Sequence, residues 1–310
     1  MKRISIAPSL EYIQPDPSKK SMNCSAILIK GSPKILIDGQ MGSGKRGSRK
    51  TISLLEEEKP DKAFVSHYHL DHSFWGPLVA EHSKADLYIP RQEEGHLTDL
   101  ECFLQKTAMD SGPNSPINAW THLLKDIIGY RELKDYGVYD GSLKLRSGGV
   151  TMQCIEAPGH SPGHMAFYFL EAKALFVVDI GIDRFGPWYG WPDADLCLMV
   201  ESILRLRSLE TNVILTSHSG ILSSGLEEAW DGSLRALLTR EREIREKLDK
   251  GTSRETIVAE GIYYKMRLPR SEPQRSFRMM WEGNIFDHHM ALINNGSLAG
   301  SFPELRKIRI

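Results

Sequence analysis

The chain of 310 residues lacks the features that would mark a membrane protein or an exported protein. It has no run of about 18 apolar residues, the length that a helix needs to span a bilayer. Its first eight residues, MKRISIAP, carry positive charge but precede no apolar core of the kind found in a signal peptide. We therefore expect a cytoplasmic protein with no membrane partner.

Cysteine is also scarce, and the four that occur are far apart: Cys24, Cys102, Cys154 and Cys197. None belongs to a Cys-x-x-Cys pair, so the pattern predicts small side chains that stay reduced rather than a disulfide framework or a zinc ribbon. Neither sign of charge is in excess, because 39 Lys and Arg residues face 40 Asp and Glu residues. Nothing in the composition therefore favours a nucleic-acid partner, and a small-molecule substrate is expected.

Metal-capable side chains, by contrast, are concentrated in one short segment. Four of them occur within six positions, just after the apolar run 63–65: His67, His69, Asp71 and His72. Histidine nitrogen and aspartate oxygen bind borderline cations such as zinc. A loop leaving a strand can aim the first two side chains at one ion and the last two at a second. The spacing therefore predicts half of a two-metal site, against the alternative of exposed loop histidines that bind nothing.

Three further candidates follow, each where an apolar run or a glycine-rich turn ends. His160 lies among prolines and glycines that favour tight turns. Asp179 closes the apolar run 174–178, where a buried carboxylate needs a cation or several donors. His218 ends another apolar run. His164, four residues after His160, is expected either to hydrogen-bond behind the site or to be purely structural.

These motifs resemble, in order and spacing, those of the metallo-β-lactamase superfamily over roughly residues 20 to 225. The resemblance implies a first metal ion held by His67, His69 and His160, a second held by Asp71, His72 and His218, and a bridge between them at Asp179. It also implies that Asp38 supports the site without binding metal. In the family a small hydroxyl residue follows this aspartate, whereas Gly39 and Gln40 follow it here.

The implied chemistry is hydrolysis of a small molecule. Two divalent ions, zinc first and manganese or iron as alternatives, would hold a hydroxide that Asp71 and Asp179 orient toward an ester, thioester or lactone bond. A phosphodiesterase or ribonuclease is the alternative hydrolase, and a mononuclear iron sulfur dioxygenase is an alternative from another class. A non-catalytic binding protein would be expected to have lost at least one ligand, and none is lost.

The resemblance also excludes several branches of the superfamily. True β-lactamases lack a bridging aspartate at the position of Asp179. Flavodiiron proteins carry a glutamate where His69 stands, together with a flavodoxin domain for which this chain has no motif. Nucleases that process messenger RNA or repair DNA insert a large domain after the bridging aspartate, whereas Asp179 and His218 are only 39 positions apart.

The order of the apolar runs predicts one catalytic core with added helices. Segment 25–38 has the pattern strand, turn, strand, and more strands are expected near 143–180. Interleaved helices favour a four-layer αβ/βα sandwich, two sheets with helices on both outer faces. We expect the core to span 1–230 and a helical extension, 231–310, to pack on it. The oligomeric state is open, with a homodimer as one candidate.

Two segments are candidates for the substrate pocket. Apolar residues at helical spacing over 92–140 predict a helical insertion that either walls the pocket or covers a sheet face. Segment 185–192 holds four aromatic residues among glycines and prolines, in a loop that should lie near the metals. Its Trp188, Tyr189 and Trp191 are predicted to line the pocket, with burial against the insertion as the alternative.

In the extension, the charged run 235–250 predicts a helix with a solvated face, and Ser253 predicts the start of another helix. Further on, His288 and His289 either reach back toward the substrate or lie at a surface. Adjacent positions on a helix point about 100° apart, so the two cannot share one role. His96 carries no spacing signal.

Overall fold

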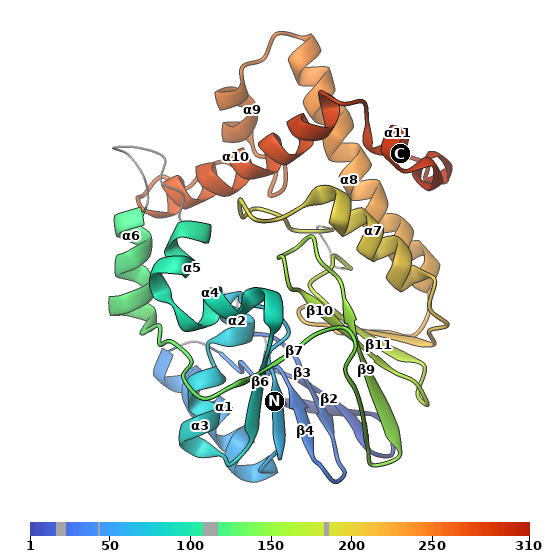
Figure 1. Ribbon diagram of the computed structural model, residues 1–310. Helices are drawn as coiled ribbons and strands as arrows, with labels where there is room; N and C mark the ends of the chain where they lie inside the picture. The colour runs from blue at the N-terminus through green and yellow to red at the C-terminus, as the bar shows by residue number, and fades with distance from the viewer. Residues whose placement is uncertain (17–22, 43, 108–116, 183–185) are drawn as a thin grey trace.

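The computed structural model describes residues 1–16, 23–42, 44–107, 117–182 and 186–310. Its strands form two sheets that pack face to face (Figure 1). The first sheet has seven strands in chain order: β1 (Lys2–Ala7), β2 (Leu10–Gln14), β3 (Ala26–Ile29), β4 (Ile35–Ile37), β5 (Lys62–Phe64), β6 (Asp86–Pro90) and β7 (Gly137–Tyr139). The second has six, in the order β13 (Ile221–Leu222), β12 (Val213–Thr216), β11 (Ala174–Val178), β10 (Met165–Phe169), β9 (Val150–Glu156) and β8 (Lys144–Ser147).

Strand direction determines where the strand ends meet. Strands β1 to β4 pair antiparallel, and β4 to β7 pair parallel. In the second sheet, β8 to β11 are antiparallel, β12 is parallel to β11, and β13 returns antiparallel. Because parallel strands share a direction, the carboxyl ends of β4, β5 and β6 lie at one edge of the first sheet, and those of β11 and β12 lie at one edge of the second.

Alternate side chains of the central strands face two different cores. In β3, Ile27 packs between the sheets, whereas Leu28 faces the outer side of the first sheet. In β11, Phe176 packs between the sheets and Val177 faces the outer side of the second. Apolar residues on both faces of a strand require cover on both faces. Helices provide that cover, and the predicted four-layer sandwich is confirmed.

Helices lie on both outer faces of the sandwich. The first sheet is covered by α1 (Gly44–Glu58), α2 (Leu70–Ser73) and α3 (Gly76–His82). The second is covered by α7 (Leu196–Arg207) and the long helix α8 (Leu226–Asp249). In Figure 1, α1 and α3 stand on the opposite side of the sheets from α7 and α8.

The insertion predicted at 92–140 is largely helical where the structure describes it. It contains η1 (Arg91–Glu93), α4 (Glu94–Thr98), α5 (Leu100–Thr107), α6 (Ile117–His122) and the π-helix η2 (Leu123–Ile128). The prediction was wrong at its far end, where residues 137–139 form β7. Val138 and Tyr139 favour strand and extend the first sheet beside β6.

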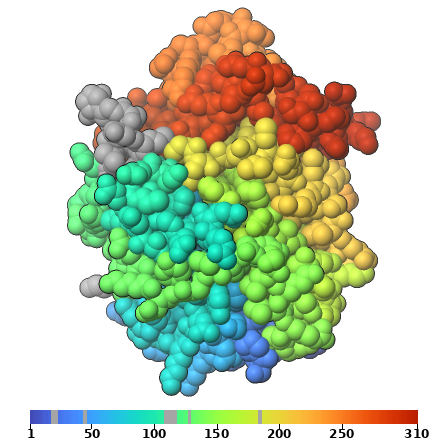
Figure 2. Space-filling view, in the orientation of Figure 1, coloured from blue at the N-terminus to red at the C-terminus, as the bar shows by residue number. Residues whose placement is uncertain are grey.

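The carboxyl-terminal helices lie across one end of the molecule, above the insertion and the segment that follows residue 186 (Figure 2). They are α9 (Arg254–Glu260), α10 (Gln274–Ile293), α11 (Leu298–Ser301) and the short 3-10 helix η3 (Pro303–Lys307). Ser253 caps α9, as predicted, by accepting the N–H of Thr256 at 3.3 Å. The boundary predicted at 230/231 falls inside α8, whose Trp230 and Leu234 join the cluster that covers the second sheet.

The charged run on α8 is not wholly solvated, and the prediction was wrong at Arg240 and Glu241, which are buried. The Nη1 atom of Arg240 donates to the carbonyl of Pro187 at 2.7 Å, and a carboxylate oxygen of Glu241 accepts the N–H of Leu298 at 2.7 Å. Both side chains are covered because segments far along the chain pack over this helix. In the parts of the chain that the structure describes, no helix has both the length and the apolar character to cross a membrane.

Candidate functional site

The predicted ligands lie on loops at one end of the sandwich. The segment 66–72 follows β5, Asp179 follows β11, and His218 follows β12 after one residue. His160 lies on the loop that joins β9 to β10. Residues from both sheets thus converge at the edge where the sheets meet.

Two strained backbone positions aim carboxylates into this edge. Asp38 has φ 52°, and Val178, directly before Asp179, has φ 54°. Such values cost free energy in residues other than glycine, especially in a β-branched valine, and they persist only where the surroundings impose them. At Gly159 a Cβ atom would lie 2.3 Å from the backbone nitrogen of Met199. Only glycine fits there, so the turn that presents His160 depends on it.

The first cluster contains His67, His69 and His160, with ligand atoms all within 4.8 Å of one another. The Nε2 atoms of all three are buried and have no hydrogen-bond partner among the described residues. The Nδ1 atom of His160 lies 2.8 Å from the carbonyl of Trp188, which fixes the ring. Burial, reinforced by the neighbouring histidines, lowers the pKa of His67 and His69 well below its usual value. Neutral imidazoles with free nitrogens are what a metal ion requires.

The second cluster contains Asp71, His72, Asp179 and His218. One oxygen of Asp179, Oδ2, lies 3.4 Å from His72 Nε2, 3.3 Å from His218 Nε2 and 3.7 Å from His160 Nε2. Asp179 therefore stands between the two clusters. Its other oxygen, Oδ1, is buried without a hydrogen-bond partner within the described chain. The unpaired nitrogens and oxygen fit a dinuclear metal site.

Charge distinguishes the second cluster from the first. Burial by itself lowers the pKa of His218, but the adjacent Asp179 and Asp71 outweigh it and hold that pKa well above its usual value. Burial likewise raises the pKa of Asp179, but His218 and His72 outweigh it and hold that pKa well below its usual value. The two carboxylates thus favour positive charge at this place.

Two residues behind the site orient its side chains. Asp38 is fully buried and accepts the backbone N–H of Ser66 at 3.0 Å and its hydroxyl at 2.8 Å. The Nδ1 atom of His72 lies 2.8 Å from the same carboxylate, so the Nε2 of His72 faces Asp179. His164 is also fully buried, and its Nε2 accepts the backbone N–H of Asp179 at 3.1 Å. Of the two roles weighed for His164, the structure places it in the first, hydrogen-bonded behind the site.

Cys24 lies close to this machinery, with its sulfur within 4.8 Å of ligand atoms of Asp38 and His72. Burial raises the pKa of the Cys24 thiol, which favours its protonated form. All four cysteines are free, as predicted.

Two acidic residues that the sequence analysis missed, the buried Glu93 and the partly exposed Asp193, contact Tyr68. Glu93 accepts the backbone N–H of Tyr68, and Asp193 accepts its phenol at 3.0 Å. His96 stacks on the Tyr68 ring at 4.2 Å and places Nε2 3.0 Å from Asp193. Burial raises the pKa of Glu93 to about 7, against the hydrogen bonds from Ser161 and Gly163 that lower it. The only sequence signal for Glu93 was a charge just past an apolar strand.

A cavity of about 410 Å³ opens over the two clusters. Its walls are mainly aromatic, and its described lining residues include no lysine or arginine: Tyr68, His69, Leu70, Asp71, Phe103, Trp120, Leu123, His160, Asp179, Trp188, Trp191, His218, Tyr263, Phe277 and Trp281. The insertion therefore walls the cavity through α5, α6 and η2, the first of its two predicted roles.

The aromatic walls come from three separate segments of the chain that touch one another. The ring centroid of Trp191 lies 5.5 Å from Trp120 of the insertion, 5.8 Å from Trp188 and 5.8 Å from Trp281 of α10. The centroid of the His69 ring lies 5.7 Å from that of Trp188, so the aromatic wall contacts the metal-capable residues that form the floor of the cavity. Sequence analysis missed the third wall, although Phe277 and Trp281 are four residues apart and so lie on one face of α10.

The prediction that Tyr189 lines this cavity was wrong. Tyr189 is fully buried, and its hydroxyl lies 2.8 Å from His289 Nε2 and 3.1 Å from Arg240 Nη1, because successive residues of the loop point to opposite sides. His288 and His289 do not line the cavity either; His288 Nε2 lies 2.9 Å from the carbonyl of Trp191. Both histidines therefore support the aromatic loop from behind. Phe185 lies outside the described residues.

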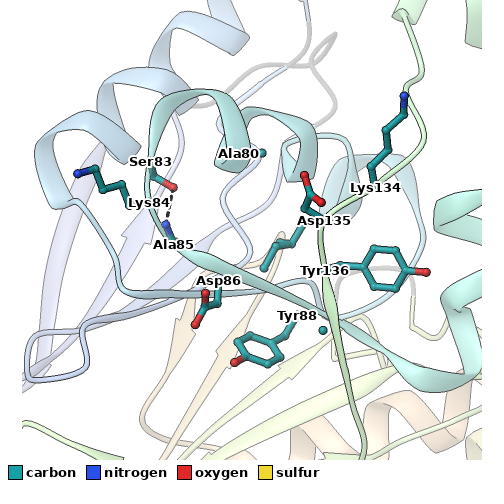
Figure 3. Close-up of a pocket in the computed structure, with 11 residues that line it drawn as sticks. Ala80, Ser83, Lys84, Ala85, Asp86, Tyr88, Lys134, Asp135 and Tyr136 are labelled. Carbon is teal, nitrogen blue, oxygen red and sulfur yellow. Dashed lines mark hydrogen bonds between the residues drawn. The ribbon is translucent and has the colours of Figure 1, made fainter.

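A second cavity, of about 690 Å³, lies between α3, β6 and residues 134–137 (Figure 3). Lys84 and Lys134 extend on opposite sides of it, and Asp86 and Asp135 balance their charge. Its described lining contains none of the metal-capable groups of the two clusters. The chemistry is therefore at the smaller, aromatic cavity.

Comparison with known proteins agrees with this fold. The crystal structure of a metallo-beta-lactamase family protein from Thermus thermophilus superposes with a TM-score of 0.67 at 19% identity, over 94% of this chain and 95% of that one. A beta-lactamase domain protein from Burkholderia ambifaria gives a TM-score of 0.71 at 18% identity, over 95% and 89% of the chains. These likenesses show the fold.

Two further comparisons extend the picture. A protein solved in a di-iron-bound form has a TM-score of 0.50 at 24% identity, over 70% of this chain and 97% of that one. The curated protein avaE of Aspergillus versicolor is 32% identical over 99 residues, so the chain aligns with only 29% of that relative's length. The family model described as the metallo-beta-lactamase superfamily matches residues 21–218, and the chain belongs to that superfamily.

Proposed function

We propose that the protein is a dinuclear-metal hydrolase that cleaves an ester, thioester or lactone bond of a small molecule with an apolar, flat body. The observation that carries the proposal is the set of buried, unpaired ligand atoms at the floor of an aromatic cavity. Such atoms cost free energy unless a partner satisfies them, and a cation can satisfy several of them at once. Members of the superfamily are mostly hydrolases, which agrees with this assignment.

In this proposal His67, His69 and His160 would hold one ion, Asp71, His72 and His218 would hold the other, and Asp179 would serve as a ligand shared between them. Divalent ions bound there supply a water of lowered pKa and a positive site for the oxygen that gains charge. Zinc is our first choice for both positions, with manganese and iron as alternatives. Addition of water across the acyl bond releases an acid and an alcohol from an ester, an acid and a thiol from a thioester, and a single hydroxy acid from a lactone.

The rest of the chain orients the reactants. Asp38 and the carbonyl of Trp188 fix the rings of His72 and His160, so the ligand nitrogens need little reorganisation. The aromatic walls exclude water from an apolar substrate body and place its acyl group against the floor. The absence of lysine and arginine from the described lining favours an uncharged acyl compound over a phosphodiester.

The decisive experiment measures metal content on protein purified without added metal, together with turnover of a panel. The panel contains thioesters, lactones, aryl esters and a phosphodiester, each with a methyl-bearing and a phenyl-bearing member. About two metals per chain with turnover of an acyl substrate is expected. A single iron without hydrolysis would instead support the sulfur dioxygenase, and a chain that binds no metal would refute the site.

A matched pair of variants tests the assignment of the bridge. Asp179→Asn keeps the volume of the side chain but removes its charge, so we expect it to lose bound metal and nearly all turnover. Asp86→Asn is the control, because Asp86 is exposed and lies in the other cavity. Full activity in a metal-depleted Asp179→Asn protein would end the proposal.

A further inference from the structure

Glu93, at the end of η1, makes contacts that the proposed reaction does not explain. Its side chain is fully buried. One carboxylate oxygen accepts the backbone N–H of Tyr68, and the other accepts the hydroxyl of Ser161 and the backbone N–H of Gly163, the latter at 2.9 Å. A single acidic group therefore gathers three donors from two different loops.

These two loops carry the three histidines of the first cluster. Tyr68 lies between His67 and His69 on the loop after β5 of the first sheet. Ser161 follows His160 on the loop between β9 and β10 of the second sheet. The Glu93 carboxylate thus links a loop of the first sheet to a loop of the second, directly beside the first cluster.

Local backbone chemistry is adapted to this contact. At Gly163 a Cβ atom would lie 2.6 Å from Cγ of Glu93, a distance that carbon atoms do not tolerate. The glycine therefore allows the carboxylate to approach the second loop. All three bonds require an acceptor, and a carboxylate accepts at both oxygens, whereas an amide would place its NH₂ against a donor.

We propose that Glu93 is a positioning residue that holds His67 and His69 on one loop and His160 on the other at the spacing that one metal ion requires. The inference rests on the proposed metal site and adds a residue that binds neither metal nor substrate. Groups of this kind typically change metal affinity by about 10-fold to 100-fold when they are replaced.

The chain offers a matched control in Glu282 of α10. Glu282 is also fully buried and also accepts three donors, the backbone N–H groups of Ile262 at 2.7 Å, Tyr263 at 2.9 Å and Tyr264 at 3.1 Å. Glu282 holds the loop 262–264, which contributes Tyr263 to the cavity wall, and in the described chain it does not hydrogen-bond to the loops that carry the metal-capable residues. Glu93→Gln and Glu282→Gln therefore remove the same chemistry from two places.

The experiment titrates metal-free parent protein and both variants with Co²⁺ at pH 8, and follows the absorption of each of two sites. We expect Glu93→Gln to weaken one site about 10-fold to 100-fold, with a changed absorption spectrum, and to leave the other within about threefold. Glu282→Gln should bind both ions as the parent does. Glu93→Asp, which keeps the charge, should recover part of the affinity.

A second readout needs no metal. In metal-free Glu93→Gln, the amides of Tyr68 and Gly163 should exchange with deuterium faster than in the parent, whereas Glu282→Gln should affect residues 262–264 instead. Unchanged cobalt affinity and unchanged exchange in Glu93→Gln would overturn the proposal. So would equal weakening of both sites accompanied by the same loss of melting temperature in both glutamine variants. A parent protein that takes up no cobalt would refute the proposed function rather than the role of Glu93.

Discussion

At the scale of single residues, some metal-capable side chains of the site already use one polar atom in a hydrogen bond to the protein and leave the other polar atom unpaired. His72 and His160 each direct one ring nitrogen to an oxygen of the protein and leave the other free. Asp179 is held by its backbone N–H, which donates to His164, and by the unusual φ of the preceding Val178. These three ligands are therefore oriented by the protein before any ion arrives, which reduces the cost of binding.

This arrangement predicts a specific effect for Asp38→Asn. The carboxylate of Asp38 contacts the N–H and hydroxyl of Ser66 and the Nδ1 of His72. The NH₂ of an asparagine would point a donor at one of these groups, so the ring of His72 would lose its orientation. We expect affinity for the second metal ion to fall about 10-fold to 100-fold, measured by metal titration. Asp140→Asn, at a partly exposed position outside the site, serves as the control and should bind as the parent does. Equal affinity in the two variants would contradict the role given to Asp38.

A second prediction at this scale concerns His289 and pH. Burial lowers the pKa of His289 to about 3, whereas an unfolded histidine titrates near 6.5. Between these values the unfolded chain binds the extra proton, so His289 makes stability fall as pH falls from about 6.5 toward 3. We expect His289→Gln to show a smaller drop in melting temperature between pH 7 and pH 5 than the parent. His82→Gln, at a partly exposed site, is the control substitution; identical slopes for the parent and His289→Gln would disprove the assignment.

At the scale of elements, the cavity is a joint product of segments far apart in sequence. Helices α5 and α6 supply one wall, the loop after β11 supplies the second, and α10 supplies the third. No one of these segments encloses a substrate alone. Selectivity should therefore respond to changes in any wall, while the metal floor stays intact.

The third wall gives the sharpest test of this idea. Trp281→Leu removes part of a large apolar face, so we expect kcat/KM for the phenyl-bearing member of the substrate panel to fall about 10-fold to 100-fold, or about 1.4 to 2.8 kcal/mol. Turnover of the methyl-bearing member and metal content should stay within about threefold. Met290→Leu is the control on the same helix, because Met290 packs against the apolar cluster that covers the second sheet and is not among the described residues that line the cavity. An equal loss for both substrates would argue against a substrate-facing role.

At the scale of the whole molecule, metal binding is expected to couple to folding. The two sheets meet at an edge that gathers several buried, unpaired polar atoms, and an ion that satisfies them binds the folded chain alone. At a free metal concentration 100 times Kd, one site adds about 2.7 kcal/mol to the free energy of unfolding.

We therefore expect a strong chelator to lower the melting temperature by several degrees. Adding back zinc in stoichiometric amounts should restore it. The Asp179→Asn protein serves as the control, because it should melt at the same temperature with and without chelator. A parent melting temperature that ignores both chelator and zinc would count against a metal at this edge.

Much of the protein was predictable from the sequence, for local reasons. Ligand spacing at 67–72 and the positions of His160, Asp179 and His218 depend on strand ends, which short apolar runs and turn residues mark. The alternation of buried side chains along β3 and β11 likewise follows from the period of a strand. These features can be recognised from a few neighbouring residues, so the sandwich could be predicted from the sequence. The structure then places the predicted ligands close together.

Only the tertiary structure decided which side each loop residue faces and what distant segments meet. Trp188 and Trp191 line the cavity, whereas Tyr189, which lies between them in the sequence, turns away from it. Trp281 reaches the cavity from a segment much later in the chain. Glu93 gains its role solely because two loops from different sheets converge on it. A loop has no fixed period and a long-range contact has no local signal, so packing alone determines them.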